Sequence, residues 1–66
     1  MTDINDVQAA MRLWHEAHTA VMDFYEAHNV LEPARYEEWM VLRRVEDDVR
    51  RQADILIERA RSELPA

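Results

Sequence analysis

The sequence predicts an all-α protein, a hairpin of two antiparallel helices that we expect to dimerise into a four-helix bundle. Three observations lead to this prediction. The 66-residue chain has no glycine, and tight β-turns usually need glycine or Asn-Gly. Apolar residues recur at intervals of three and four, the spacing of a helix face. Pro33 lies between two such stretches, where it can end one helix and begin the next.

The first helix is expected over about residues 5–28, with Thr2 or Asp3 as its cap. One stripe of apolar and semi-polar residues follows an unbroken 3-4 spacing: Ile4, Val7, Met11, Trp14, His18, Val21, Tyr25 and His28. A second stripe runs beside it, and it consists of Ala10, Leu13, Ala17, Ala20, Phe24, Ala27 and Leu31.

The two stripes are separated by about 110° on a helix with 100° per residue. We expect helix two to cover the first stripe, which leaves the alanine-rich stripe exposed in a monomer. A helix that is apolar over so much of its surface has to be buried on two sides. The second stripe is therefore the predicted self-association surface, with candidates Ala10, Leu13, Ala17, Ala20, Phe24 and Ala27.

The turn is expected at residues 29–33. Asn29 suits a helix end with a left-handed backbone, and Pro33 suits the first position of the next helix, where no N–H is needed. Proline also disfavours helical geometry at Glu32.

The second helix is expected over about residues 34–63. Its predicted buried stripe has 3-4-4 spacing: Leu42, Val45, Val49, Ala53, Leu56, Ala60 and Leu64. The opposite face alternates arginine with acid at i,i+4, which predicts surface pairs worth about 0.3–0.5 kcal/mol each. These pairs are Arg43–Asp47, Arg44–Asp48, Glu46–Arg50, Asp47–Arg51 and Arg50–Asp54.

An aromatic and methionine cluster is predicted near the turn, where Phe24, Tyr25, Leu31, Tyr36, Trp39 and Met40 converge. Exposed aromatic and methionine side chains are enriched in protein interfaces. Tyr36, Trp39 and Met40 are therefore the candidates for binding a partner protein. The competing interpretation is that these side chains only cover the turn or complete the bundle core.

Two other kinds of site are weaker hypotheses. His15 and His18 lie three residues apart, but the Glu-x-x-His and His-Glu-x-x-His metal motifs are absent. We therefore expect no metal and no cofactor. Arg43, Arg44, Arg50 and Arg51 could contact nucleic acid, so the alternative function is a nucleic-acid-linked regulator that uses this face of helix two. Neighbouring aspartates cancel the field of these arginines, so we do not expect nucleic acid as the main partner.

The composition of the chain excludes several classes of site and of function. The chain has no cysteine, which excludes disulfides and thiolate metal sites. It carries a net charge of −6, and all eight of its basic residues are arginine. No catalytic constellation or membrane segment is apparent. We therefore expect a non-enzymatic interaction module, an adaptor, inhibitor or modulator of a cellular or host protein.

We expect this module to act as a homodimer, with a tetramer as the alternative. Small scaffolds without disulfides or metals usually depend on oligomerisation or exceptional packing. The expected compartment is the cytoplasm, since the sequence has no signal peptide pattern at its start. A chain rich in arginine without lysine suits a GC-rich bacterium or its phage.

Overall fold

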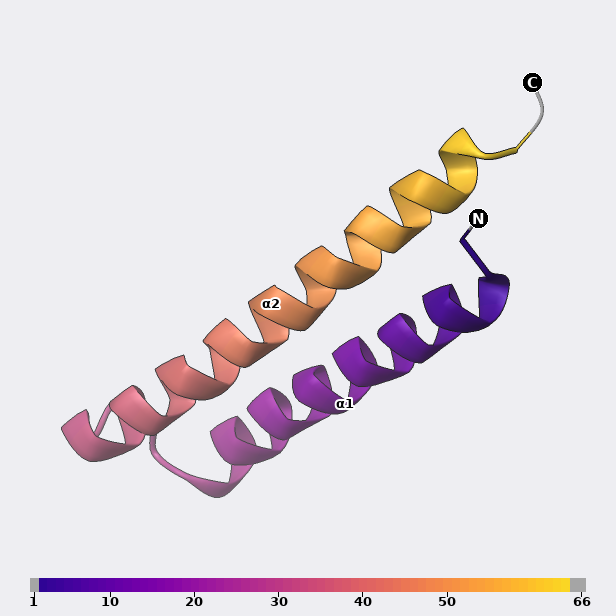
Figure 1. Cartoon of the computed structure of the whole chain (residues 1–66). Coiled ribbons are helices and arrows are strands. Elements are labelled where there is room, and N and C mark those ends of the chain that lie inside the picture. The colour runs from indigo at the N-terminus through magenta and orange to yellow at the C-terminus, as the bar shows by residue number, and fades with distance from the viewer. Residues whose placement is uncertain (1, 65–66) are drawn as a thin grey trace.

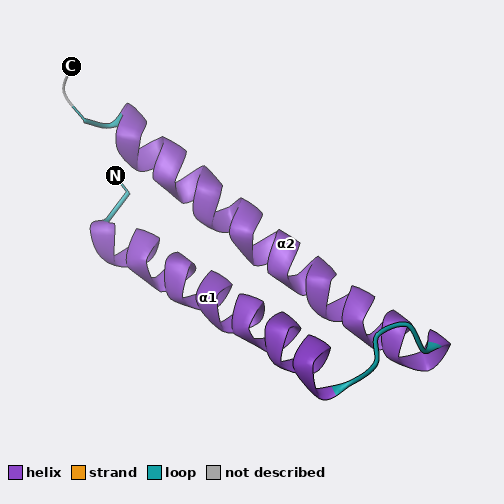
Figure 2. Ribbon diagram, turned by 180° about the vertical axis from the view of Figure 1, so that it is seen from behind, coloured by secondary structure: helices purple, strands orange, loops and turns teal. Residues whose placement is uncertain are grey.

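The computed structural model describes residues 2–64, and it is an all-α hairpin. Helix α1 spans Ile4–Ala27 and helix α2 spans Pro33–Ser62. The two helices run antiparallel in contact along their length, with both chain ends at one end of the hairpin and the turn at the other (Figures 1 and 2). Each boundary lies within one residue of its predicted position, and the described residues form no strand.

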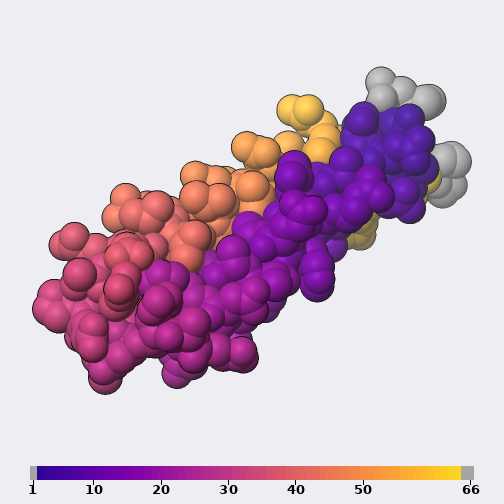
Figure 3. All heavy atoms as spheres, turned by 90° about the horizontal axis from the view of Figure 1, so that it is seen from below, coloured from indigo at the N-terminus to yellow at the C-terminus, as the bar shows by residue number. Residues whose placement is uncertain are grey.

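The hairpin is a rod rather than a sphere. Its principal extents are 51 × 15 × 14 Å and its radius of gyration is 15.2 Å, compared with about 11 Å for a compact domain of this length. The space-filling view shows the two helices side by side with no third layer over them (Figure 3). Neither helix, over the described residues, combines the length and apolarity needed to cross a bilayer.

Both helix starts follow from local chemistry. The Asp3 side chain accepts a 3.0 Å hydrogen bond from the Asn5 N–H, which satisfies one of the free amides of the first turn. Helix α2 begins at Pro33, after the extended Glu32. Asp3 and Pro33 therefore have the capping roles that the sequence predicted.

The end of α1 differs from the prediction. No described residue has a positive φ, so Asn29 does not provide a left-handed cap. Instead His28 is extended, and the Asn29 side chain accepts a 3.0 Å hydrogen bond from the Leu31 N–H. An asparagine side chain can mimic a backbone turn in this way. The chain thus leaves α1 by an Asx turn.

The helices meet along a seam of half-buried and buried side chains with strict 3-4 spacing, the heptad pattern of a coiled coil. In α1 these are Val7, Ala10, Trp14, Ala17, Val21 and Phe24. In α2 they are Arg35, Trp39, Leu42, Glu46, Val49, Ala53, Leu56 and Ala60.

This seam corrects the predicted stripes. Helix α2 does not cover the first stripe of α1 alone, because the seam takes alternate members of both stripes. Val45 of α2, and Leu64 beyond the end of that helix, were predicted to be buried but are 49% and 69% exposed. Glu46 is half-buried in the seam, because a strict heptad counted from Leu42 reaches residue 46 rather than 45.

The core is small. Only Val21, Val30 and Ala53 are buried among the apolar side chains described, and none is large. Val30 closes the core beneath the turn, whereas Leu31, which was predicted to join the cluster there, is 86% exposed. The hairpin therefore buries little apolar surface by itself.

A polar clamp joins the two chain ends. The Glu63 carboxylate accepts hydrogen bonds from the Thr2 N–H at 2.7 Å and the Thr2 hydroxyl at 3.0 Å. The backbone N–H of Thr2 is the main reason that the pKa of Glu63 lies below its ordinary value.

Ala53 is 1% exposed and sits in the seam, so Ala53→Leu is expected to force the helices apart. Overpacking of this kind costs roughly 1–3 kcal/mol, which urea unfolding followed by circular dichroism can measure. Ala9→Leu places the same side chain at an exposed position of α1 and is expected to change stability by less than about 0.5 kcal/mol. Equal effects of the two variants would contradict the seam.

The clamp is expected to open in acid. Because the pKa of Glu63 is lowered in the folded chain, its stabilisation is complete above the ordinary glutamate pKa of about 4.3 and is lost as the pH falls through the lower folded value. The amide NMR signal of Thr2 should shift with that transition. A Glu63→Gln variant should lack it, and a midpoint at or above the ordinary value would contradict the clamp.

Candidate interaction surfaces

Five side chains near the turn form what we call the aromatic cluster: Tyr25, Tyr36, Trp39, Met40 and Arg43. The Trp39 ring centroid lies 5.9 Å from that of Tyr25 and 6.4 Å from that of Tyr36, both in tilted arrangements. Such pairs add about 0.5–1.5 kcal/mol beyond the apolar area that they bury. Helix α1 supplies Tyr25 and helix α2 the rest, so the cluster spans the helix junction.

Arg43 is held within the cluster. Its guanidinium carbon lies 4.8 Å from the Trp39 ring centroid, and its Nη1 donates to Met40 Sδ at 3.6 Å. A guanidinium over an indole face is attracted by the ring quadrupole. Sequence reasoning missed this role and placed Arg43 with the possible nucleic-acid contacts. The sequence did contain an indication of this contact, because Arg43 follows Trp39 by four residues and side chains at that spacing lie on one face of a helix.

The structure therefore brings together the three predicted partner-binding residues, Tyr36, Trp39 and Met40. Trp39 and Met40 are half-buried, while Tyr36 and Tyr25 are 47% and 52% exposed. Phe24 was predicted to join them but lies in the seam, where its ring stacks on His28 at 4.5 Å.

A shallow pocket of about 470 Å³ adjoins the cluster on the turn side. It is lined by Tyr25, His28, Asn29, Val30, Leu31 and Trp39. The exposed rings and this pocket provide an apolar surface with polar edges, which is the usual composition of a protein-binding site.

A second feature bridges the helices at mid-length. His18 Nδ1 lies 2.8 Å from Glu46 Oε1. Because a carboxylate oxygen only accepts hydrogen bonds, His18 Nδ1 carries the hydrogen and donates the bond to Glu46. The Glu46 side chain is 19% exposed and that of His18 is 53% exposed. The bridge explains why the seam tolerates a glutamate.

The histidines do not gather metal ligands. His15 and His18 lie in a pocket of about 260 Å³ with Met11 and Trp14. Within residues 2–64, no group of three or more histidine, cysteine, aspartate or glutamate side chains is arranged to hold a metal. His18 is already engaged with Glu46.

The arginines of α2 are paired differently from the prediction. None of the five predicted i,i+4 pairs forms an ion pair among the described residues; Arg50 contacts Asp47 at 3.5 Å, an i,i+3 pair. Glu46, the predicted partner of Arg50, turns to His18 instead. The four arginines proposed for nucleic acid, Arg43, Arg44, Arg50 and Arg51, therefore share their helix with acids, and Arg43 lies over the Trp39 ring.

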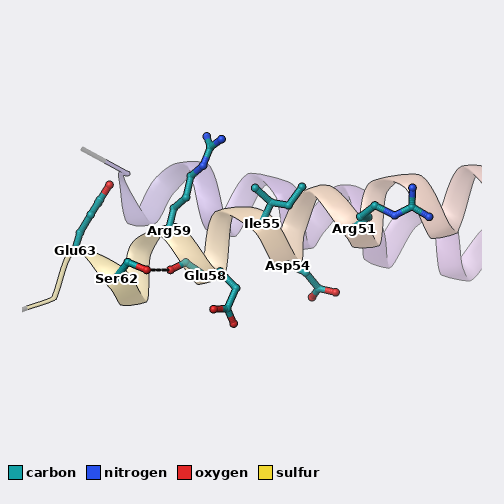
Figure 4. Close-up of a pocket in the computed structure, with 7 residues that line it drawn as sticks. All are labelled: Arg51, Asp54, Ile55, Glu58, Arg59, Ser62 and Glu63. Carbon is teal, nitrogen blue, oxygen red and sulfur yellow. Dashed lines mark hydrogen bonds between the residues drawn. The ribbon is translucent and has the colours of Figure 1, made fainter.

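A depression of about 490 Å³ follows the C-terminal turns of α2 (Figure 4). Figure 4 shows Asp54 and Glu58 pointing to one side of the helix and Arg59 to another, while the Ser62 hydroxyl donates to the Glu58 carbonyl at 2.8 Å. These charged groups therefore diverge rather than point toward a common centre.

The predicted self-association residues divide into two groups. Ala10, Ala17 and Phe24 are half-buried in the seam, while Leu13, Ala20 and Ala27 are exposed. In α2, Val41 and Val45 are also exposed, at 54% and 49%. Sequence reasoning missed both valines, because it assigned Val45 to the buried stripe of helix two and gave Val41 no role.

Two indole N–H groups in the seam, Trp14 Nε1 and Trp39 Nε1, are buried without a hydrogen-bond acceptor. An unsatisfied buried donor costs about 1–3 kcal/mol. Within the single chain, the two tryptophans therefore contribute packing, but their indole N–H groups make no hydrogen bond.

The His18–Glu46 bridge is expected to couple the helices. A double-mutant cycle with His18→Ala and Glu46→Ala should give a coupling energy of about 0.5–1.5 kcal/mol at neutral pH, the usual net value of a hydrogen bond. Urea unfolding of the four proteins measures it. A cycle between His15→Ala and Glu46→Ala provides the control, and equal coupling in the two cycles would refute the bridge.

No protein-family model, no curated protein and no solved structure matches this chain. The function proposed below therefore rests on the residues, contacts and surface of the hairpin.

Proposed function

We propose that this protein is a non-enzymatic interaction module that works as a homodimer and binds another protein as an adaptor, inhibitor or modulator. The observation that carries the proposal is the surface area of the single chain, which is 5371 Å². A folded monomer of 7.9 kDa is expected to expose about 4,400 Å².

The chain therefore exposes about 1,000 Å² more than expected, an area similar to that buried by one partner in a protein interface. Standard protein interfaces bury about 800 Å² on each partner. Covering one such area would bring the hairpin close to the exposed surface of an ordinary folded protein. Self-association would therefore add the buried apolar area that this small core lacks.

The exposed side chains support the same proposal. Large apolar residues that are 46–63% exposed occur along both helices, Ile4, Leu13, Val41, Val45 and Ile55 among them. Scattered apolar residues are normal on a surface, but contiguous apolar patches indicate a binding site.

The aromatic cluster is the surface proposed for the second protein. Tryptophan, tyrosine and arginine are the residue types that dominate binding energy in interfaces, and the cluster contains all three at the junction of the helices. We expect the complex to form in the cytoplasm, where a chain without cysteine loses nothing to the reducing conditions.

Sedimentation equilibrium tests the homodimer. The expected mass is about 16 kDa, twice the 7.9 kDa of one chain, and the melting temperature should rise with protein concentration, because association stabilises the folded state by mass action. A folded single copy of 7.9 kDa at high micromolar concentration, with a melting temperature independent of concentration, would overturn the proposal.

The partner surface can be tested by capture from the source cell. Tyr36→Ala removes an exposed ring from the cluster and is expected to weaken capture of a specific protein at least tenfold, the effect of about 1.4 kcal/mol. Met11→Ala, which removes a 37% exposed side chain of α1 far from the cluster and its pocket, is the control. Equal capture by the two variants would argue against the cluster as the docking surface.

A further inference from the structure

The exposed apolar residues lie on two sides of the hairpin. The His18–Glu46 hydrogen bond and the Tyr25–Trp39 contact define one side. At 100° per residue, Leu13 and Ala20 project from the opposite flank of α1, and Val45 projects from the matching flank of α2. All three are exposed.

The antiparallel register makes this second side continuous. His18 pairs with Glu46 and Tyr25 with Trp39, so residues whose numbers add up to about 64 lie level with each other across the two helices. Ala20 consequently lies level with the segment between Val41 and Val45. We call this surface the alanine–valine face, and it consists of the exposed residues Leu13, Ala20, Ala27, Val41 and Val45.

We infer that the alanine–valine face is the homodimer interface and that its occupant is the same face of a second copy. This inference rests on the proposed function, because it gives the location of the dimer contact proposed there. The excess area of about 1,000 Å² per chain calls for one standard interface, and this face offers exposed apolar side chains from both helices, with Ala20 level with the segment between Val41 and Val45.

Shape makes the face self-complementary. The alanines of α1 leave a shallow strip that permits close approach of a helix, and interhelical distances of 8–10 Å require such small contact residues at the lower limit. Leu13 lies in the same row as Ala20 and Ala27 at one end of it, and the two valines of α2 are the other larger side chains of the face. In a two-fold dimer the same patch serves both copies, so the larger residues of one chain meet the alanines of the other.

The opposite side is less suited to a second copy. Its apolar residues alternate with groups that already have partners, namely Glu46 with His18, and Arg43 with Trp39 and Met40. Burying those polar groups in a dimer would add a desolvation cost without new pairing. Dimerisation through the alanine–valine face leaves the aromatic cluster of each chain free.

The absence of cysteine in the sequence makes a direct test simple. Single-cysteine variants Ala20→Cys and Val45→Cys place a thiol in the face, and Met22→Cys places one on the other side of α1. Met22 is 42% exposed and lies 200° from Ala20 around the helix. Each purified variant is labelled with a bulky maleimide across a range of protein concentrations.

At concentrations where sedimentation gives a dimer, labelling of Ala20→Cys and Val45→Cys is expected to slow at least tenfold relative to dilute protein, while Met22→Cys keeps its rate. Protection of Met22→Cys alone, or no protection in a dimer that still forms, would overturn the interface while leaving the homodimer intact. A monomer at every concentration would overturn the homodimer itself.

A charged pair of variants provides the second readout. Ala20→Glu puts a carboxylate in the proposed contact and is expected to raise the dimer dissociation constant at least a hundredfold, whereas Met22→Glu, with the same change of charge, alters it less than threefold. Circular dichroism above and below the dissociation constant of each variant reports helix content separately. Equal effects of the two substitutions on dimerisation would also overturn the assignment of the face.

Discussion

The heptad seam between α1 and α2 is the constraint on which the rest of the molecule depends. Two helices can bury only one stripe each against the other, and here the stripes include four alanines, Ala10, Ala17, Ala53 and Ala60. Small side chains bring the helix axes close together but bury little apolar area. The seam therefore sets the shape of the rod without supplying the stability that a larger core would give.

Polar contacts fix the alignment of α1 against α2, which the small apolar core alone would hold only weakly. The His18–Glu46 bridge lies at mid-length, and the Thr2–Glu63 clamp lies at the open end. A polar pair in or beside a helical seam contributes less to stability than to register, because any slip by one turn leaves a buried group without its partner. Together with the turn, these contacts hold α1 and α2 in one alignment, and that alignment is what makes the alanine–valine face and the aromatic cluster continuous across the two helices.

Much of this fold could be predicted from the sequence, because its signals are local. Asp3 and Pro33 mark helix starts by their own hydrogen-bonding chemistry, and the long 3-4 repeats fix the element type. The seam of α2 was predicted one residue off at Val45, because an apolar residue was preferred over Glu46. Only the opposite helix, which brings His18 within 2.8 Å, makes the glutamate acceptable there. For the candidate surfaces, the three cluster residues of α2 were foreseen, but Arg43 and the two valines were not, since their roles depend on contacts between helices or on the true phase of the seam.

The strict heptad repeat of the seam has a consequence for how such a chain can change in length. Removing seven consecutive residues from α1 and the seven that lie level with them in α2 would leave every remaining seam residue facing its present neighbours. The rod would shorten by about 10 Å per deletion, while the turn and the terminal clamp would keep their own sequences. The length of the hairpin can therefore change in steps of seven residues per helix while the sequences of the turn and of the terminal clamp stay the same.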